Sequence, residues 1–145
     1  MRKITTETIA AEGIIAAVYA AMCILLAPLS FMAVQFRFSE ALMILPFFNK
    51  KHTIGLTLGC FIANIFSPLP LDMLFGTAAT LLACVAVSLM KNKLLISVAA
   101  AAINGIIVGA ELYFVFGGQF LPLAASVFVG EVVVVQIGVF FAIVA

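Results

Sequence analysis

The sequence predicts an all-α membrane protein, built as a bundle of six transmembrane helices. Its 145 residues are 66% hydrophobic and only 9% charged, whereas soluble domains carry roughly 25% charged residues. The mean hydropathy is +1.36, and the apolar runs are long enough to cross a bilayer as helices. The net charge of +1 offers no basic surface for nucleic acid. Composition therefore excludes soluble and nucleic-acid-binding classes.

Prolines, glycines and charged clusters divide the chain into six apolar segments, which we interpret as one domain over residues 1–145. The predicted spans are residues 9–29, 32–48, 53–67, 71–90, 94–116 and 120–145. Some are shorter than the roughly 20 residues that cross the hydrocarbon core, and Pro46 interrupts the second. Short or interrupted spans are tolerated where they line a cavity within the protein.

The two ends of the chain raise separate expectations. The first apolar run is longer than a signal-peptide core of roughly 7–15 residues, so we expect a retained first span. The C-terminal sequence lacks a basic stop, which leaves open whether the native chain continues beyond Ala145.

Lysines and arginines predict the orientation. In a six-span topology, six of them fall on one side: Arg2, Lys3, Lys50, Lys51, Lys91 and Lys93. That side should be the cytoplasm, with both termini inside. The seventh basic residue, Arg37, falls near the outer surface, and this exception makes it the first candidate for function. We assign no role to His52, which lies in a predicted cytoplasmic loop with no second metal ligand nearby.

Polar residues of the spans predict a small-molecule pocket open to the outside. The candidate substrate-binding residues are Arg37, Glu40, Asn64, Asp72, Asn104, Glu111 and Glu131, with Gln35 beside the first of them. A charged side chain at the bilayer centre costs about 2.5–3.5 kcal/mol by insertion scales, so such groups usually face a bundle interior and carry function. A rise of 1.5 Å per residue places the set at outer to middle depth, with Asn104 and Glu131 roughly 17–18 Å down.

A purely structural interpretation of the same residues is also open. Arg37 and Glu40 are three residues apart, so on a helix they can neutralise each other. Asn64 and Asn104 can hydrogen-bond between helices. Four acids against one arginine favour a binding site, because structure alone would not need the surplus carboxylates.

Small residues form a second pattern, on the first predicted span. Ala16, Ala17, Ala20 and Ala21 recur at helical spacing and allow another helix to approach closely. The partner is either a helix of the same bundle or one of another protein. The three cysteines, Cys23, Cys60 and Cys84, lie in apolar runs and are interpreted as small packing residues.

Motif absences narrow the function. The sequence contains no phosphate-binding G-x-x-x-x-G-K-[ST] loop, no H-E-x-x-H zinc motif and no nucleophile elbow. We therefore expect no enzymatic activity, no metal and no cofactor in this chain. A pocket without an energy source favours a binding subunit that is driven by a partner.

Five stretches resemble the QueT family. They are "FRFSEALMILPFF", "GLTLGCFIANIFSP", "LDMLFGTAATLLA", "NGIIVGAELYFVF" and "VGEVVVVQ", and the resemblance covers about residues 10–138. Members of this family are substrate-binding S components of energy-coupling-factor (ECF) transporters, associated with uptake of queuosine precursors. The family motifs fall on all seven candidate binding residues.

The resemblance implies a six-helix S component in the bacterial plasma membrane. It implies capture of a 7-deazaguanine from outside: the 7-aminomethyl base, the 7-cyano base or queuine. It also implies docking on a membrane T component with two ATPase subunits, which use the ATP. The alanine-rich face of the first helix meets the T component in S components generally. Three alternatives stay open: a stand-alone proton-coupled carrier, an S component for another vitamin-like substrate, and an intramembrane enzyme.

Overall fold

The computed structural model describes residues 3–30 and 36–145, and these residues form helices and short connections with no strand. The α-helices are α1 (Thr6–Leu25), α2 (Ala27–Ser30), α3 (Leu45–Phe48), α4 (His52–Ile65), α5 (Asp72–Leu89), α6 (Ile96–Phe116) and α7 (Phe120–Val144). Two 3-10 helices, η1 (Phe38–Ile44) and η2 (Lys93–Leu95), complete the set. The all-α prediction is confirmed. The predicted count of six helices is wrong, because the described residues contain seven α-helices. Gln35 lies outside the described residues.

Prolines explain the additional helices. Pro28 lies in α2, just after α1 ends, so the first apolar segment is broken into a long and a short helix. Pro46 lies in the first turn of α3, where a helix does not need the N–H group that proline lacks. The same missing N–H prevents a continuous series of α-helical hydrogen bonds from the preceding residues. The second segment therefore runs as η1 followed by α3 rather than as one α-helix.

Four helices are long and apolar enough to cross a membrane: Thr6–Leu25, Asp72–Leu89, Lys93–Phe116 and Phe120–Val144. The second and third predicted spans are shorter helices, Phe38–Phe48 and His52–Ile65. The exposed surface of the long helices is apolar; Leu25, for example, is 80% exposed and Leu121 is 77% exposed. Side chains of this kind are suited to contact with lipid.

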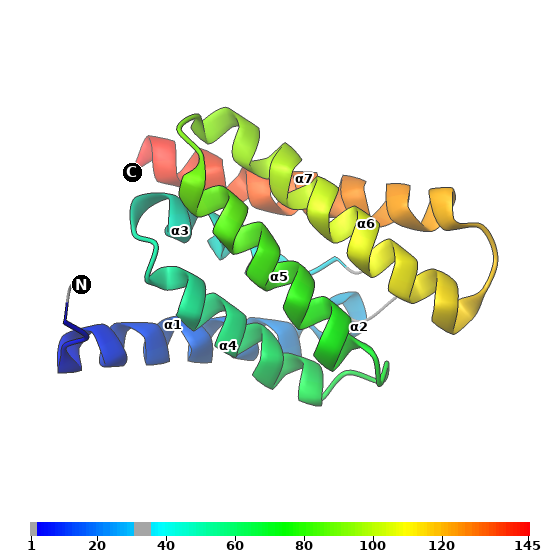
Figure 1. Cartoon of the computed structure of the whole chain (residues 1–145), viewed down its shortest axis with the longest axis horizontal. Coiled ribbons are helices and arrows are strands. Elements are labelled where there is room, and N and C mark those ends of the chain that lie inside the picture. Colours follow the sequence, from blue (N-terminus) through cyan, green and yellow to red (C-terminus); the bar gives the residue numbers. More distant parts are fainter. Residues whose placement is uncertain (1–2, 31–35) are drawn as a thin grey trace.

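The six apolar segments pack in a closed ring (Figure 1). Going round it, α1 contacts α4, α4 contacts α5, α5 contacts α6, α6 contacts α7, α7 contacts η1, and η1 contacts α1. The segment that is second in the chain thus lies between the first and the last. Gly138 allows this closure, because a side chain there would run into the backbone carbonyl of Ala41 on η1.

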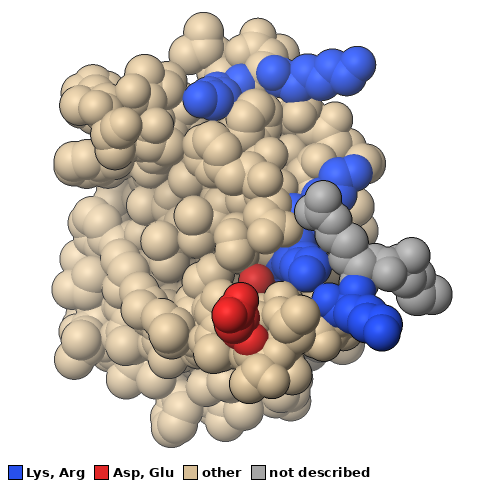
Figure 2. Space-filling model, turned by 90° about the vertical axis from the view of Figure 1, so that its left-hand side faces the viewer, with Lys and Arg blue, Asp and Glu red and all other residues tan. Residues whose placement is uncertain are grey.

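Both described ends of the chain lie at one end of the bundle, together with the α3–α4 and α5–α6 connections (Figure 1). Figure 2 views this end and shows lysine and arginine side chains gathered on it. At the opposite end, α6 turns into α7 through Gly117 and Gly118, whose φ angles of 70° and 90° favour glycine. The arrangement fits the predicted grouping of basic residues. Which end faces the cytoplasm stays a prediction.

His52 differs from its expected place in a loop. It is the first residue of α4, and its Nδ1 atom lies 2.8 Å from Oε1 of Glu12 on α1. The other oxygen of Glu12 accepts the N–H of Gly55 at 3.0 Å. Glu12 therefore caps the first turn of α4 from a different helix, a role that the residue preceding α4 does not fill with its own side chain.

Candidate functional site

A narrow cavity lies inside the ring of helices. It is lined by Arg37, Glu40, Gly76, Thr80, Asn104, Val108, Val127 and Glu131. These residues come from η1 and the residue before it, α5, α6 and α7. The space between the side chains has room for about one water molecule. A ligand the size of a nucleobase would therefore require the helices around the cavity to move apart.

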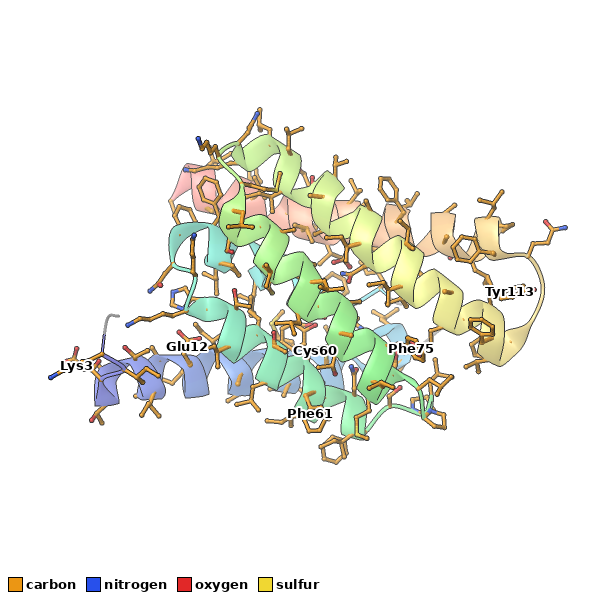
Figure 3. All side chains as sticks on the ribbon, in the orientation of Figure 1. Lys3, Glu12, Cys60, Phe61, Phe75 and Tyr113 are labelled. Atoms are coloured by element: carbon orange, nitrogen blue, oxygen red, sulfur yellow. The ribbon has the colours of Figure 1, made fainter. Side chains whose placement is uncertain are left out.

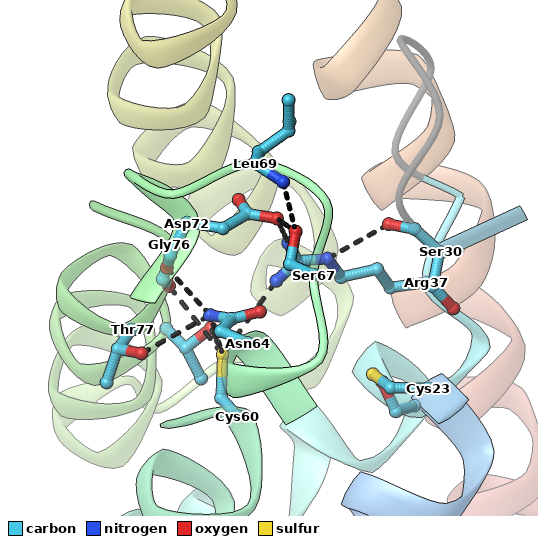
Figure 4. Close-up of polar contacts among 12 residues, drawn as sticks. Cys23, Ser30, Arg37, Cys60, Asn64, Ser67, Leu69, Asp72, Gly76 and Thr77 are labelled. Carbon is cyan, nitrogen blue, oxygen red and sulfur yellow. Dashed lines mark hydrogen bonds and ion pairs between the residues drawn. The ribbon is translucent and has the colours of Figure 1, made fainter. Parts of the chain in front are cut away.

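Arg37 is almost fully buried and is paired across the bundle (Figure 4). Its Nη2 atom lies 3.1 Å from Oδ2 of Asp72, at the start of α5. Its Nε donates to the carbonyl of Ser30 at 3.3 Å, and its Nη1 donates to the sulfur of Cys60 at 3.8 Å. The ion pair of Arg37 is thus with Asp72, whereas the purely structural interpretation had paired it with Glu40. The physical reason is that Arg37 precedes the 3-10 helix in extended conformation, so the α-helical three-residue spacing does not apply.

Asn64 and Ser67 hold the start of α5 in place. The amide nitrogen of Asn64 donates to the backbone carbonyl of Asp72 at 2.8 Å, and the hydroxyl of Ser67 donates to Oδ2 of Asp72 at 2.6 Å. Asp72, the partner of Arg37, is therefore held through its backbone carbonyl by Asn64 at the end of α4, and through its carboxylate by Ser67 in the connection that follows. Asn64 and Asp72 support the cavity wall without lining it.

Glu40 is held through one oxygen only. Its Oε1 accepts hydrogen bonds from the hydroxyl of Tyr19 on α1 and from that of Thr80 on α5. Its Oε2 is buried, with no hydrogen-bond partner among the described residues. A buried acceptor without a partner is rare in native proteins, because it loses its bonds to water and gains none in return.

Asn104 and Glu131 form the opposite wall. The Asn104 amide nitrogen donates to Oε1 of Glu131 at 2.5 Å, and this contact joins α6 to α7. Asn104 Oδ1 is buried and has no partner within the described part of the chain. Like Glu40 Oε2, it is a hydrogen-bond acceptor available to a ligand that carries donors.

Glu111 lies beside this set rather than on the cavity. It is fully buried, and it is close enough to Asp72 and Arg37 to interact with both electrostatically. Neither of its carboxyl oxygens has a hydrogen-bond partner among the described residues. The structure therefore gathers all seven predicted residues in one polar region. Arg37, Glu40, Asn104 and Glu131 line the cavity, while Asn64, Asp72 and Glu111 lie behind Arg37.

Comparison with known proteins identifies the family to which the chain belongs. The family model described as QueT transporter matches residues 9–145. The chain belongs to the QueT transporter family. This is a family of transporters, so the chain is not an enzyme, and its apolar helices place it in the cell membrane as a multi-pass protein.

A curated relative is similar to part of this QueT chain. The Queuosine precursor transporter QueT of Lactococcus lactis subsp. cremoris (strain MG1363) is 39% identical over 83 residues, which cover 56% of this chain and 49% of the relative. The chain thus matches about half the length of that protein. No solved structure matches the chain significantly.

Besides Ser67, further residues of the QueT chain's polar region lie outside the sequence-predicted set, among them Tyr19, Cys60 and Thr80. Tyr19 and Thr80 donate to Glu40, and the Cys60 sulfur lies 3.2 Å from the Thr80 hydroxyl. All three cysteines are buried and free, but Cys60 takes part in the polar network rather than serving only as packing. No motif marks these residues, since tyrosine, threonine and cysteine are ordinary members of membrane helices.

The alanine strip of the QueT chain is divided by the fold. Ala16 and Ala20 are buried in the bundle, and Gly59 of α4 packs against the backbone of Ala16. Ala17 and Ala21 are exposed. The first pair therefore makes the intramolecular α1–α4 contact, and only the second pair is available to another protein.

Proposed function

We propose that this chain is the substrate-binding S component of an ATP-driven ECF importer and that it captures a queuosine precursor, a 7-deazaguanine, in the cavity between η1, α5, α6 and α7. The observation that carries the proposal is the set of buried, unpartnered acceptors around that cavity, Glu40 Oε2 and Asn104 Oδ1. Family membership and the name of the Lactococcus relative support this class of substrate.

The chemistry of a deazaguanine complements these acceptors. The base carries a ring N–H next to an exocyclic amine, and a carboxylate accepts from both at once. Hydrogen bonds to an ionised acceptor contribute about 1.5–3 kcal/mol. We assign Glu131 to this edge, because the sequence places it near the middle of the membrane, and because its neighbour Asn104 offers Oδ1 alongside. Glu40 would then face the 7-substituent, and Arg37 would balance the surplus of acids.

Calorimetry on the purified chain tests the assignment. Glu131→Gln keeps the shape of the side chain but places a donor against a donor, so affinity for the base should fall about 10- to 100-fold, at 1.4 kcal/mol per tenfold. Glu7→Gln, at an exposed acid outside the cavity, is the matched control and should bind normally. Binding of Glu131→Gln within about threefold of the unsubstituted chain would transfer the role to another acid.

The proposed membrane T component would meet α1 on its exposed small residues, Ala17 and Ala21. Ala17→Leu adds bulk where helices would approach closely, at a site that does not line the cavity. It should weaken co-purification with the T component and its two ATPase subunits while leaving base binding nearly unchanged. Ala125→Leu, on the exposed surface of α7, is the control. If Ala17→Leu forms a normal complex, Ala17 and Ala21 contact lipid rather than the T component.

ATP dependence distinguishes the importer from the carrier alternative. Uptake into cells should require the ATPase subunits, because this chain has no phosphate-binding loop of its own. Uptake that survives without them would identify a stand-alone carrier.

The proposed orientation places both termini in the cytoplasm. Lys51→Cys and Gly118→Cys, at opposite ends of the bundle, should react with a membrane-impermeant maleimide from opposite sides of the membrane. The three native cysteines are buried, so the unsubstituted chain reports the background. Reaction of both positions from the same side would rule out this topology.

A further inference from the structure

We propose that Tyr19 is a positioning residue for substrate selection: it fixes Glu40 so that the unpartnered Oε2 is available to a ligand in the cavity, and the site thereby prefers a base whose 7-substituent carries a positive charge. This inference rests on the proposed function, since it concerns how the same cavity chooses among queuosine precursors. It adds a residue of α1 to a site whose other members lie on η1, α5, α6 and α7.

The contact between Tyr19 and Glu40 joins two segments that are distant in sequence. Tyr19 is fully buried on α1, and its hydroxyl donates to Glu40 Oε1. Thr80, from α5, donates to the same oxygen at 3.4 Å. Two donors on one oxygen, together with the nearby Arg37, favour the ionised carboxylate, whereas burial favours the neutral acid; a cationic ligand would tip this balance toward the carboxylate. The two donors also fix its rotation, because Oε1 is occupied by both of them, while Oε2 of this cavity-lining residue is left without a partner among the described residues.

The charge balance of the region indicates what Oε2 would bind. Four buried acids, Glu40, Asp72, Glu111 and Glu131, stand against one buried arginine, Arg37, and that arginine is already paired with Asp72 at 3.1 Å. Burying like charges together is unfavourable unless a cation offsets them. One acid suffices to read the guanine edge, so a second acid facing the cavity favours a cationic group on the ligand.

The 7-substituents of the candidate bases differ in this property. A 7-aminomethyl group is a protonated amine with three donors, whereas a 7-cyano group is neutral and only accepts hydrogen bonds. An ionised Glu40 attracts the first and offers nothing to the second. The ratio of the two affinities therefore reports the state and position of Glu40, which a merely structural role of Tyr19 would not change.

Calorimetry with 7-aminomethyl-7-deazaguanine and 7-cyano-7-deazaguanine tests the inference. The unsubstituted chain should bind the aminomethyl base at least about tenfold more tightly. Tyr19→Phe should lower this preference about tenfold, since the loss of one hydrogen bond to a charged group has this effect. Tyr113→Phe is the matched control: Tyr113 is exposed on α6, does not line the cavity and lies far from Cys60 in Figure 3, so it should leave the ratio unchanged.

A double-mutant cycle separates positioning from general destabilisation. Glu40→Gln should abolish the preference, and adding Tyr19→Phe to it should change the ratio no further. The melting temperature of each variant, measured without ligand, reports folding, and Glu40→Gln tests the charge even if Tyr19→Phe unfolds.

The failures are distinguishable. An unchanged ratio in Tyr19→Phe, or a preference of the unsubstituted chain for the cyano base, would overturn the inference while leaving base capture intact. Failure of the unsubstituted chain to bind either base would overturn the proposed function itself.

Discussion

Arg37 should be the least replaceable charged residue of the bundle. It is 5% exposed and Asp72 is 0% exposed, so their ion pair is shielded from water. At 3.1 Å and an effective dielectric constant near 20, the attraction is about 5 kcal/mol. Removing one partner of a buried pair typically costs 3–5 kcal/mol, because the other charge is left buried without compensation.

The two partners should not be equivalent. Arg37→Gln leaves four buried acids with no arginine among them, so we expect the full loss of about 3–5 kcal/mol in the free energy of unfolding. Asp72→Asn leaves Arg37 near Glu111, which already interacts with it. The loss should then be nearer the 1–3 kcal/mol of an incompletely satisfied polar group.

Denaturant titration in detergent micelles measures both free energies of unfolding. Lys3→Gln, at an exposed lysine, controls for the loss of a positive charge. The double variant, Arg37→Gln with Asp72→Asn, should recover part of the loss seen with Arg37→Gln, because one surplus acid is then neutral. If Asp72→Asn proves as destabilising as Arg37→Gln, or if the double variant recovers nothing, the surplus of acids does not determine the stability of the site.

Two further substitutions probe the packing around the site and at the end of the bundle. Gly76→Ala should weaken base binding by about 1–3 kcal/mol, since its methyl group would lie 2.9 Å from the Asn64 amide nitrogen. Gly13→Ala, whose methyl group would have nothing within 4 Å, should bind the base normally in the same calorimetric assay. Equal binding by the two variants would refute the packing argument. Glu12→Ala removes the acceptor for the Gly55 N–H and should lower the free energy of unfolding by about 1 kcal/mol, with base affinity retained; a denaturation curve identical to that of the unsubstituted chain would show that the cap is dispensable.

Sequence reasoning located the polar region well because its signal is local. A charged or amide side chain in an apolar run is conspicuous at any position, and the helical rise gives its approximate depth. All seven of the predicted residues do meet in the structure, including Asn104 and Glu131, which share a hydrogen bond between α6 and α7.

The pairing within the region was harder to predict, because it depends on how the second segment folds. An α-helix would have placed Arg37 beside Glu40, but Arg37 precedes η1 in an extended conformation and pairs with Asp72 instead. Glu40 instead bonds Tyr19. A tyrosine in an apolar span has no pattern that distinguishes a hydrogen-bond donor to a buried acid from a packing residue, so only the tertiary arrangement reveals it.

His52 illustrates the same limit at the end of the bundle. Its place between two lysines and an apolar run resembles a loop, yet α4 begins there. Helix starts are usually recognised from a capping side chain in the preceding residue. Here the cap comes from Glu12, which lies far back in the sequence on α1, so no local signal marks the boundary.

The ion pair between Arg37 and Asp72 also constrains the biogenesis of the protein. The ribosome delivers Arg37 and Glu40 well before Asp72, and an unpaired charge inside the bilayer is unfavourable, by up to about 2.5–3.5 kcal/mol at the centre on insertion scales. Until α5 emerges with its aspartate, the segment that carries η1 is expected to wait at the membrane surface while α1 spans alone. The ring of helices would then close in an order different from that of synthesis, with η1 moving into its place between α1 and α7 only after the later helices are present.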